Sequence, residues 1–302
     1  MQVFSTKTNK PHLYPFLRPH DNWHRYVDFE PIEFSISNDG KTWHSIYDQP
    51  GLDGVLCYSH QPAVANQSNE YKKLGLNDGQ VLISSSYDQR DLKMNIHFVG
   101  MSEDDMYLAM DALQQFLDTR SPIWICWEDW PQRMYYVKAK LGDPNYLSNQ
   151  GWTCEVTLTD LIGLSRSVGT TGDWNNMVQG FGNNQPIDRP VYVFTSNQFT
   201  VQNMSNVLID PERRGHPLTI TFEGSSGGNM KITNKTTGDS FTYKKAFNGK
   251  FVLDGVNPEV NGNGCLADTD YGVITLQIGK NEFQVDNFSG TVTFDFAMWW
   301  LS

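Results

Sequence analysis

The sequence predicts a mostly β protein with two domains: an α+β first domain that holds one main helix, and a β-sandwich second domain. Aromatic residues make up 13% of the 302 residues, and 25 glycines are spread among many asparagines and aspartates. This composition favours strands joined by tight turns. Only one segment shows the three- and four-residue spacing of an amphipathic helix, and the chain is long enough to form two hydrophobic cores.

The helix is predicted to begin at Ser102 and to end at Ser121 and Pro122. Ser102 is a natural N-cap, and Asp105, three residues later, can complete a capping box. The helix ends there because a proline disfavours the α conformation of the residue before it. Six apolar residues form one stripe that should lie in the core of the first domain: Met106, Ala109, Met110, Leu113, Phe116 and Leu117.

Segments with alternating or continuous apolar residues predict strands on both sides of this helix. The run Asn38-Asp39-Gly40 matches a tight type I′ hairpin turn, with residues 42–43 opening the return strand. The polar stretch around Gln61 to Asn77 is predicted to be a long surface loop. The strands expected in the first domain are 32–36, 55–58, 80–87, 91–100, 122–130, 134–141 and 152–159.

Residues 1–30 hold three prolines among histidines and aromatic residues. They are too broken by proline for a helix and too aromatic for a disordered tail. Two interpretations remain open: an extended arm that packs on a neighbouring surface, and an irregular segment that lies on its own domain.

A shift in composition marks the boundary between the domains. Gly, Asn, Gln, Pro and Asp predominate between Gly169 and Arg189, as in a linker. We therefore predict a first domain over 1–170, a linker over 171–189 and a second domain over 190–302. The strands expected in the second domain, at the spacing of a β-sandwich, are 191–194, 199–203, 218–223, 229–234, 240–244, 250–254, 273–278, 282–286 and 291–300.

The net charge of −11 argues against nucleic-acid recognition, because binding to phosphates needs clustered lysine and arginine. Residues 1–188 carry 14 basic and 23 acidic residues. Copies of this half would repel each other unless their contacts are apolar or matched in sign. No segment is long and apolar enough to span a membrane, and the N-terminus lacks the core of a signal peptide. We therefore expect a soluble protein made in a cytoplasm.

No set of residues predicts catalysis. Ser226 occupies the nucleophile position of a GxSxG match over 224–228, but that motif requires a strand leading into a helix, and both flanks here are predicted strands. His12, His20 and His24 could share a metal only on a helix that the prolines oppose. The cysteines lack metal-ligand spacing. They are expected to be reduced core residues: Cys57, Cys126, Cys154 and Cys265.

The acidic clusters have structural explanations. The run Glu103 to Asp105 fits the first turn of the helix better than a cation site. Glu128 and Asp129 are neighbours at a strand end and should point to opposite faces, whereas a glycosidase needs two carboxylates in one cleft. Residues 268–272 lack the full ligand pattern of an EF-hand loop. No cofactor or metal is therefore predicted.

Several runs of the second half form a recognisable series, among them Met230-Lys-Ile-Thr-Asn234 and Leu276-Gln-Ile-Gly279-Lys-Asn281-Glu-Phe283. Related runs lie at 199–203, 218–222, 251–254 and 294–300. The first half agrees in order, with a strand that starts Arg90-Asp-Leu, the helix, the aromatic strands and a strand that ends Leu158-Thr-Asp160. In sum the chain resembles the distal tail protein family of siphophages, the long-tailed, non-contractile bacteriophages.

The resemblance implies an N-terminal belt domain that forms a ring, expected to be a hexamer, and a C-terminal galectin-like sandwich outside it. It also implies a structural virion protein of the tail tip or baseplate, assembled in the host bacterial cytoplasm. The implied partners are further copies of the chain, the tail tube protein, a tail-associated hub protein and receptor-binding or baseplate proteins. The family brings no catalytic residues, so no enzyme activity is expected.

An alternative function is that of a carbohydrate-binding module that recognises the host cell wall. Trp299 and Trp300 are adjacent on a strand, so one should face the core and the other should face outward or a domain seam. The outward indole is a candidate contact for a saccharide or a partner protein. A third possibility, a cell-wall hydrolase, lacks a convergent set of catalytic residues.

Overall fold

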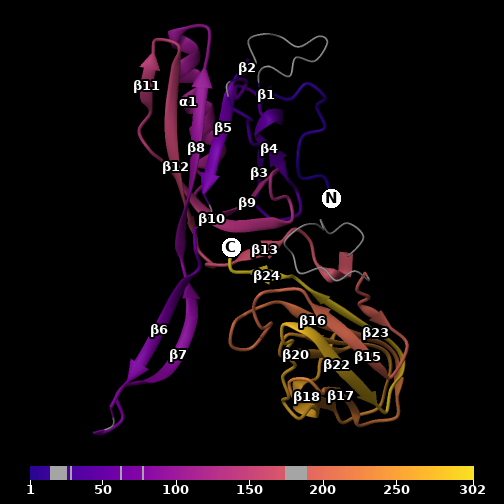
Figure 1. The fold of residues 1–302 in the computed structure, drawn as a ribbon. Coiled ribbons are helices and arrows are strands. Elements are labelled where there is room, and N and C mark those ends of the chain that lie inside the picture. Colours follow the sequence, from indigo (N-terminus) through magenta and orange to yellow (C-terminus); the bar gives the residue numbers. More distant parts are fainter. Residues whose placement is uncertain (14–25, 28, 62, 77, 174–188) are drawn as a thin grey trace. The chain divides into compact units, whose positions relative to one another are not determined.

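The computed structural model describes residues 1–13, 26–27, 29–61, 63–76, 78–173 and 189–302. The chain divides into two compact units (Figure 1). Unit 1 consists of Met1–Ser165 together with Leu301–Ser302, and unit 2 consists of Arg166–Trp300. The described residues hold one α-helix and are otherwise mainly strands, so the prediction of a mostly β protein is confirmed.

The predicted linker falls mainly outside the described residues, because residues 174–188 are not among them. Its first residues form a short 3-10 helix, η3 (Thr171–Asp173), that bonds to unit 2. The hydroxyl of Thr171 donates to the carbonyl oxygen of Phe294 (2.9 Å), and the amide of Gly172 donates to the carboxylate of Asp295 (2.8 Å). Residues 171–173 are therefore an integral part of unit 2.

Unit 1 is built on antiparallel strands in the order β4-β3-β9-β10-β12-β8-β5, with β11 paired to β12. The amide of Ile32, just before β3, donates to the carbonyl oxygen of Cys57 in β5 (2.9 Å), so the sheet curls until its two sides meet. The strands of this sheet are β3 (Phe34–Ser37), β4 (His44–Ser45), β5 (Val55–Gln61), β8 (Arg90–Val99), β9 (Ile123–Trp127), β10 (Arg133–Leu141), β11 (Asn145–Ser148) and β12 (Gly151–Asp160).

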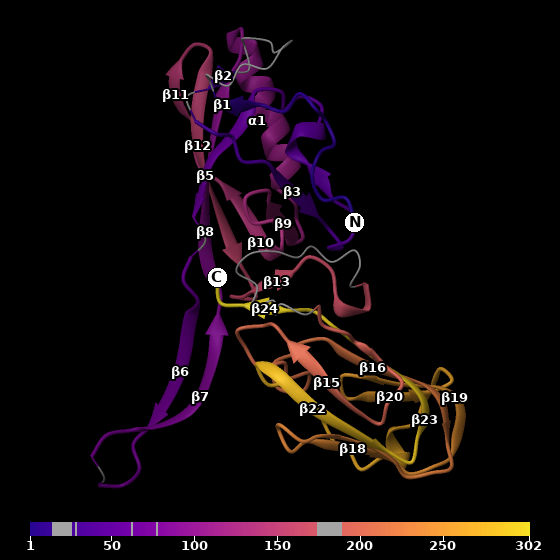
Figure 2. The same cartoon turned by 45° about the vertical axis from the view of Figure 1, so that its right-hand side comes forward.

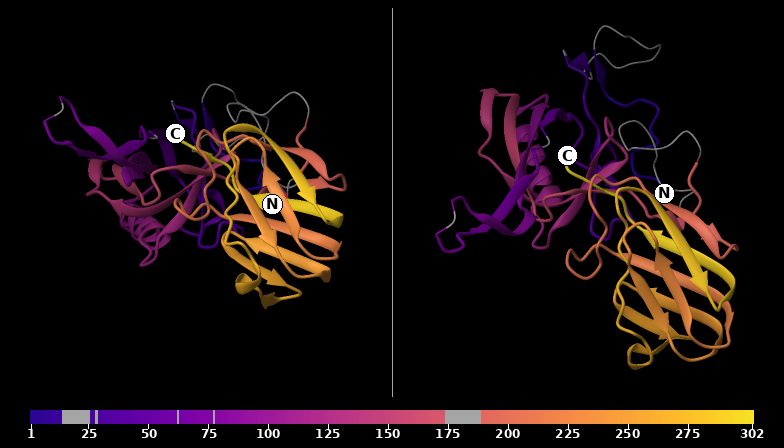
Figure 3. Two further views of the ribbon diagram at one scale, coloured as in Figure 1. Left: turned by 90° about the horizontal axis from the view of Figure 1, so that it is seen from below. Right: turned by 60° about the horizontal axis from the view of Figure 1, so that its bottom comes forward.

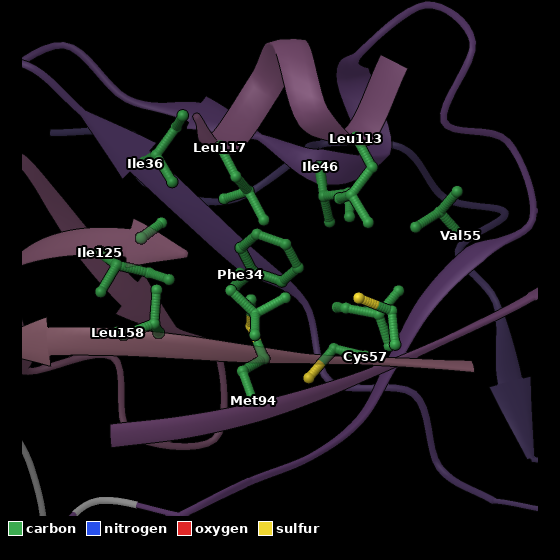
Figure 4. Packing of buried hydrophobic residues seen from close by; sticks show 14 of the residues in the cluster. Phe34, Ile36, Ile46, Val55, Cys57, Met94, Leu113, Leu117, Ile125 and Leu158 are labelled. Carbon is green, nitrogen blue, oxygen red and sulfur yellow. The ribbon is translucent and has the colours of Figure 1, made fainter. Parts of the chain in front are cut away.

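The curled sheet and the helix α1 (Glu103–Leu117) enclose one apolar core (Figure 4). Leu113 and Leu117 of the helix share this core with Phe34, Ile125 and Leu158, which come from three different strands. All five side chains are fully buried. Burial of a side chain of this size contributes about 1.5–3 kcal/mol, so the contact between helix and sheet is a main source of stability for unit 1.

The helix begins where the sequence predicts and ends earlier. The hydroxyl of Ser102 accepts from the amide of Asp105 (3.3 Å), whose carboxylate accepts from the amide of Ser102 (3.0 Å), so the capping box is confirmed. The helix ends at Leu117, and not at Pro122, because the apolar stripe stops there and no packing holds a further turn. The predicted stripe is confirmed: Met106, Ala109, Leu113 and Leu117 are buried, and Met110 and Phe116 are half-buried.

The hairpin of β3 and β4 is confirmed, but its connection is longer than the predicted tight turn. Ile36 pairs with His44, and residues 38–43 form the loop between the two strands. The carboxylate of Asp39 organises this loop by accepting from the amides of Thr42 (2.7 Å) and Lys41 (2.8 Å). These two hydrogen bonds lower the pKa of Asp39 well below its usual range. A short 3-10 helix, η2 (Ile46–Asp48), follows β4.

The polar stretch that was predicted to be a surface loop contains a strand. Strand β6 (Asn66–Lys72) pairs with β7 (Val81–Asp88) in a two-stranded antiparallel hairpin, which we call the arm. Within the described residues neither strand pairs with any other. The arm follows β5 and leads into β8, and it runs on from these two strands (Figures 1 and 2).

The described part of the N-terminal segment lies on unit 1, in agreement with the second of the two interpretations. The ammonium group of Lys10 pairs with the carboxylates of Glu33 and Glu128, and the hydroxyl of Ser5 donates to Asp48 (2.7 Å). A short parallel pair joins β1 (His12–Leu13) to β2 (Tyr26–Val27). Residues 14–25 and 28 lie outside the described residues, and with them His20 and His24.

Unit 2 contains two antiparallel sheets, in the orders β14-β23-β16-β19-β20-β21 and β15-β22-β17-β18, which lie in two layers (Figure 3). The chain enters it within β13 (Ser165–Ser167), which pairs with β24 (Trp299–Trp300). Its sheet strands are β14 (Val193–Phe194), β15 (Gln198–Asn203), β16 (Leu218–Ser226), β17 (Met230–Asn234), β18 (Ser240–Tyr243), β19 (Phe247–Asp254), β20 (Asn257–Val260), β21 (Asn263–Gly264), β22 (Gly279–Asp286) and β23 (Ser289–Phe296).

Aromatic side chains join the two layers of unit 2. The rings of Phe283 in one sheet and Phe294 in the other are 5.0 Å apart, and those of Phe241 and Phe251 are 5.8 Å apart. All four are buried, as expected of a sandwich core. The predicted β-sandwich is confirmed, while its galectin-like character stays a prediction.

Two predicted strands of unit 2 differ from the structure. Residues 273–278 make a single bridge, between Leu276 and Ile209, and then lead into β22. The last predicted strand is interrupted at Ala297 and Met298, which separate β23 from β24. A further 3-10 helix, η4 (Leu266–Asp268), lies between β21 and β22.

Candidate functional site

The arm of unit 1 presents apolar side chains to solvent at its far end. Its near half pairs polar residues, such as Ser68 with Ser86, whereas its far half pairs Tyr71 with Leu82. Leu76, next to the tip, is fully exposed. The exposed apolar residues of the far half are Tyr71, Leu74, Leu76, Val81, Leu82 and Ile83, with between 47% and 101% of each side chain accessible. A patch of this kind marks an interaction surface.

The root of the arm is held firmly on unit 1. The side chain of Asn66 donates to the carbonyl oxygen of Gln89 (3.2 Å). Gly163, with φ of +74°, packs so close to the carbonyl oxygen of Asp88 that an added Cβ would lie 2.2 Å from it. Any larger residue at 163 would displace the strand that ends the arm.

A second apolar surface lies at the other end of β8. It surrounds a cavity of about 880 Å³, which falls in the size range of binding pockets, roughly 300–1,000 Å³. Residues 7–11, 51–56 and 97–101 and the first turns of α1 line it. Three lining residues, Val99, Met101 and Leu108, remain 57–78% exposed. We call this cavity and its exposed residues the end pocket.

The two lysines that line the end pocket, Lys7 and Lys10, are paired with carboxylates of unit 1. Lys7 lies 3.6 Å from the carboxylate of Asp48. Burial acts to lower the pKa of Lys10, but the carboxylates of Glu33 and Glu128 outweigh this effect and raise it. The lining cations are therefore neutralised, and the pocket does not present a free positive charge to an anion.

Tyr47 adds a polar group to the end pocket. Its hydroxyl is buried and has no hydrogen-bond partner among the described residues. Burial raises the pKa of this hydroxyl far above its usual range, with the carboxylate of Glu33 contributing further. The group therefore stays neutral in the interior of unit 1.

Carboxylates of the first helical turn stand beside the end pocket. The pKa of Asp105 is lowered by hydrogen bonds from the backbone of Met101 and from Ser102. Glu103 accepts a hydrogen bond from the hydroxyl of Tyr107 (3.3 Å). Glu103 and Asp104 are exposed. The cap interpretation of these acids is confirmed, and they leave negative charge at this end of unit 1.

The structure places both Trp299 and Trp300 in the interior. Trp299 is 4% exposed and stacks on His216, with ring centres 5.1 Å apart. Trp300 is 1% exposed and its indole N–H donates to the carbonyl oxygen of Met204 (3.1 Å). Neither indole faces outward, so the outward alternative of the prediction is wrong. The pair offers no exposed ring for stacking on a saccharide.

The acidic pairs named from the sequence do not converge on a site. Glu128 bonds to Lys10 (3.2 Å), whereas its neighbour Asp129 bonds to His60 (2.7 Å). In unit 2, Asp268 pairs with Lys245 (2.8 Å). The carboxylate of Asp270 accepts from two backbone amides of its own loop and of β18. Within each pair the two carboxylates therefore have separate partners.

Ser226 does not stand at a strand-to-helix turn. It is the last residue of β16 and is buried, and strand β17 follows. Its hydroxyl accepts from the amide of Gly228 (3.1 Å). Over the described residues no group of three or more His, Cys, Asp or Glu side chains could hold a metal ion. In the same part of the chain, no helix is long and apolar enough to cross a membrane.

Sequence reasoning predicted the second strand of the arm, β7, but missed its partner β6, and it missed the end pocket. The arm is a strand pair without a buried face, so the alternation that normally marks a strand is absent from β6. The dense apolar run of β7 at Val81 to Ile83, all exposed in the structure, was the available signal. The end pocket is lined by five separate chain segments, and no local sequence pattern predicts that they come together.

The comparisons with known proteins find one family model and several solved structures of phage proteins. Residues 54–159 match the model of the phage tail protein RIFT-related domain family. The Dit protein of phage SPP1, described as a paradigm of hub adsorption apparatus in Gram-positive infecting phages, has the same fold: the TM-score is 0.57 at 16% identity, over 88% of this chain and 99% of that one.

Two structures of the phage P2 baseplate in its activated conformation, with Ca and with Sr, also match. Each covers 88% of this chain, at 12% identity and TM-scores of 0.42 and 0.37, and 98% and 97% of the phage chains. No curated protein matches.

The residues that match the phage tail domain model lie in unit 1, and both the arm and most of the end pocket lie within or beside them. The resemblance to siphophage distal tail proteins that the sequence suggested is confirmed.

Proposed function

We propose that this chain is the structural hub at the distal end of a siphophage tail. In this proposal unit 1 assembles into a hexameric ring that joins the tail tube to the host-adsorption apparatus. The ring is assembled in the host cytoplasm and becomes part of the virion. Its lumen passes the DNA and the tape measure protein, and unit 2 projects outward as a dock for baseplate and receptor-binding proteins. The chain performs no chemistry of its own.

The observation that carries this proposal is that the unit with the phage tail match also exposes two different apolar surfaces, the arm and the end pocket. A ring with rotational symmetry is held by heterologous contacts, in which one surface of a subunit meets a different surface of the next. A chain with two such surfaces can satisfy this requirement. The proposal also accounts for the excess of acid in the first half, because apolar contacts let acidic subunits associate.

Light scattering coupled to size-exclusion chromatography tests the proposal on the full chain, together with negative-stain imaging. We expect closed rings of about six copies, either from the chain alone or after addition of tail tube protein. A chain that stays monomeric at its highest soluble concentration, alone and with its tail partners, would overturn the proposal.

A further inference from the structure

The arm and the end pocket lie at opposite ends of the same strand pair. Strand β8 begins at Arg90, beside the arm, and ends at Val99, which lines the end pocket. Ten residues of extended chain span about 33 Å. The two surfaces are therefore well separated on one subunit, and the arm cannot reach its own end pocket by local adjustment.

We propose that the far half of the arm of one copy docks into the end pocket of a second copy of this chain. The inference rests on the proposed ring and names the contact that closes it. The partner is a second copy because one unit carries both a slender apolar projection and an apolar concavity, and this combination generates a head-to-tail contact that can repeat around a ring.

The exposed apolar surface of the arm needs a binding partner that buries it. A free two-stranded hairpin is at best marginally stable in water, and both of its edges leave backbone groups unpaired. Both strands are almost wholly exposed in the single chain, and six apolar side chains of the far half point to solvent or stand at the tip. Insertion of Leu74 and Leu76 into the end pocket would remove this apolar surface from water.

The charges of the two surfaces are complementary. The far half of the arm, residues 71–83, carries Lys72 and Lys73 against the single acid Asp78. Beside the end pocket stand Glu103 and Asp104 of the first helical turn. In the described part of the chain, no ion pair engages either lysine. Paired across subunits, these groups would fix the register of the docked arm.

Cysteine cross-linking of the full chain tests the contact directly. Cys265 is first replaced by serine, which leaves three buried cysteines as background. Leu76→Cys and Leu108→Cys are then combined in one chain and treated with a short bismaleimide. We expect a ladder of covalent multimers that ends at the ring size. A mixture of the two single variants should give cross-linked dimers only.

The matched control combines Leu76→Cys with Leu161→Cys, since Leu161 is an exposed leucine of unit 1 outside both surfaces. This pair should not cross-link. If rings form but the Leu76 and Leu108 positions fail to cross-link, the docking proposal is overturned while the proposed function stands. If cross-links appear only to an added tail protein and never between copies, the proposal is also wrong. If no rings form at all, the proposed function fails.

Charge reversal supplies a second measurement that does not depend on cysteine geometry. Lys72→Glu with Lys73→Glu should weaken self-association at least tenfold, and added Glu103→Lys with Asp104→Lys should restore most of the loss. The control, Lys41→Glu with Lys140→Glu, changes the net charge equally at two other exposed lysines of unit 1 and should have little effect. Equal weakening by both reversals, without rescue, would overturn the proposed register.

Discussion

Arg90 is a buried cation at the foot of the arm. Its Nε lies 3.1 Å from the carboxylate of Asp160, and one terminal nitrogen donates to the carbonyl oxygens of Ala63 (2.8 Å) and Leu301 (2.5 Å). The side chains of Arg90 and Asp160 are almost completely buried. Burial raises the pKa of Asp160 although the guanidinium of Arg90 opposes this. One arginine therefore joins β8, β12, the segment before the arm and the end of the chain.

Replacement of Arg90 by leucine should be strongly destabilising. It leaves the carboxylate of Asp160 buried without its cation, and such a loss typically costs about 3–5 kcal/mol. Urea unfolding followed by circular dichroism measures the effect. The control is Lys93→Met in the same strand, because Lys93 and Glu155 form an exposed pair (2.9 Å) whose loss should cost less than about 1 kcal/mol. Equal effects of the two substitutions would contradict this account.

His216 makes the stability of unit 2 depend on pH. Burial lowers its pKa, although a hydrogen bond to the carbonyl oxygen of Leu208 acts in the opposite direction. An unfolded histidine has a pKa of about 6.5. As the pH falls through this value, the unfolded chain binds a proton that the folded chain does not, so stability is present above this pH and is lost below it.

We therefore expect the free energy of unfolding to fall between pH 7.5 and pH 5.5, and to fall less in His216→Gln. Urea titrations of both proteins at the two pH values make the comparison. All other histidines are the same in the two chains, so their contribution cancels. Identical pH dependence in wild type and variant would show that His216 does not titrate differently on folding.

At the scale of elements, α1 shows how a single side chain ties the helix to the curled sheet. Leu113 is fully buried in the core, whereas Leu108 of the same helix is 67% exposed. Leu113→Ala should cost about 2–5 kcal/mol of unfolding free energy, because it removes apolar contacts and leaves a cavity. Leu108→Ala should change it little. Chemical unfolding of the two variants under the same conditions tests this contrast, and similar losses would argue against the packing described for α1.

The elements that the sequence predicted well are those with a buried face. Both the stripe of α1 and the alternation of β8 can be recognised in the local sequence, because the positions that face the core must be apolar. In β8 these positions are Leu92, Met94, Ile96 and Phe98. The arm has no buried face, so the sequence of β6 shows no apolar alternation and predicts a polar loop. The pairing of β6 with β7 depends on residues about fifteen positions away in the sequence. The conformational preferences of the residues in β6 therefore do not predict this pairing.

The same limit applies to the candidate site. Alternation predicted that Trp299 and Trp300 point to different sides of their strand, but it could not tell that both side chains are buried. Asp39 provides a second case. The residues suit a tight turn, yet the carboxylate recruits the amides of Lys41 and Thr42 and so builds a wider loop. In each case the result depends on neighbours that a local pattern does not contain.

At the scale of the whole molecule, the arm should be dispensable for folding and necessary for assembly. Glu70 pairs with Ser84, so residues 71–83 can be replaced by Asn-Gly, the pair preferred in a two-residue hairpin turn. We expect this short-arm variant to keep the unfolding midpoint of the full chain and to lose ring formation. Light scattering and urea unfolding provide the two readouts. Rings from the short-arm chain would show that assembly does not depend on the far half of the arm.

The course of the chain has a mechanical consequence. The polypeptide leaves unit 1 after Ser165, builds unit 2, and returns to unit 1 at Leu301 and Ser302, where Arg90 and Arg133 donate to their carbonyl oxygens. Unit 2 is therefore attached to unit 1 in two ways: by the peptide chain between Ser165 and Arg166, and by the hydrogen bonds that hold Leu301 and Ser302 in unit 1. A pull on unit 2 therefore acts on one covalent link and on one set of hydrogen bonds, and loss of these hydrogen bonds leaves the covalent link intact.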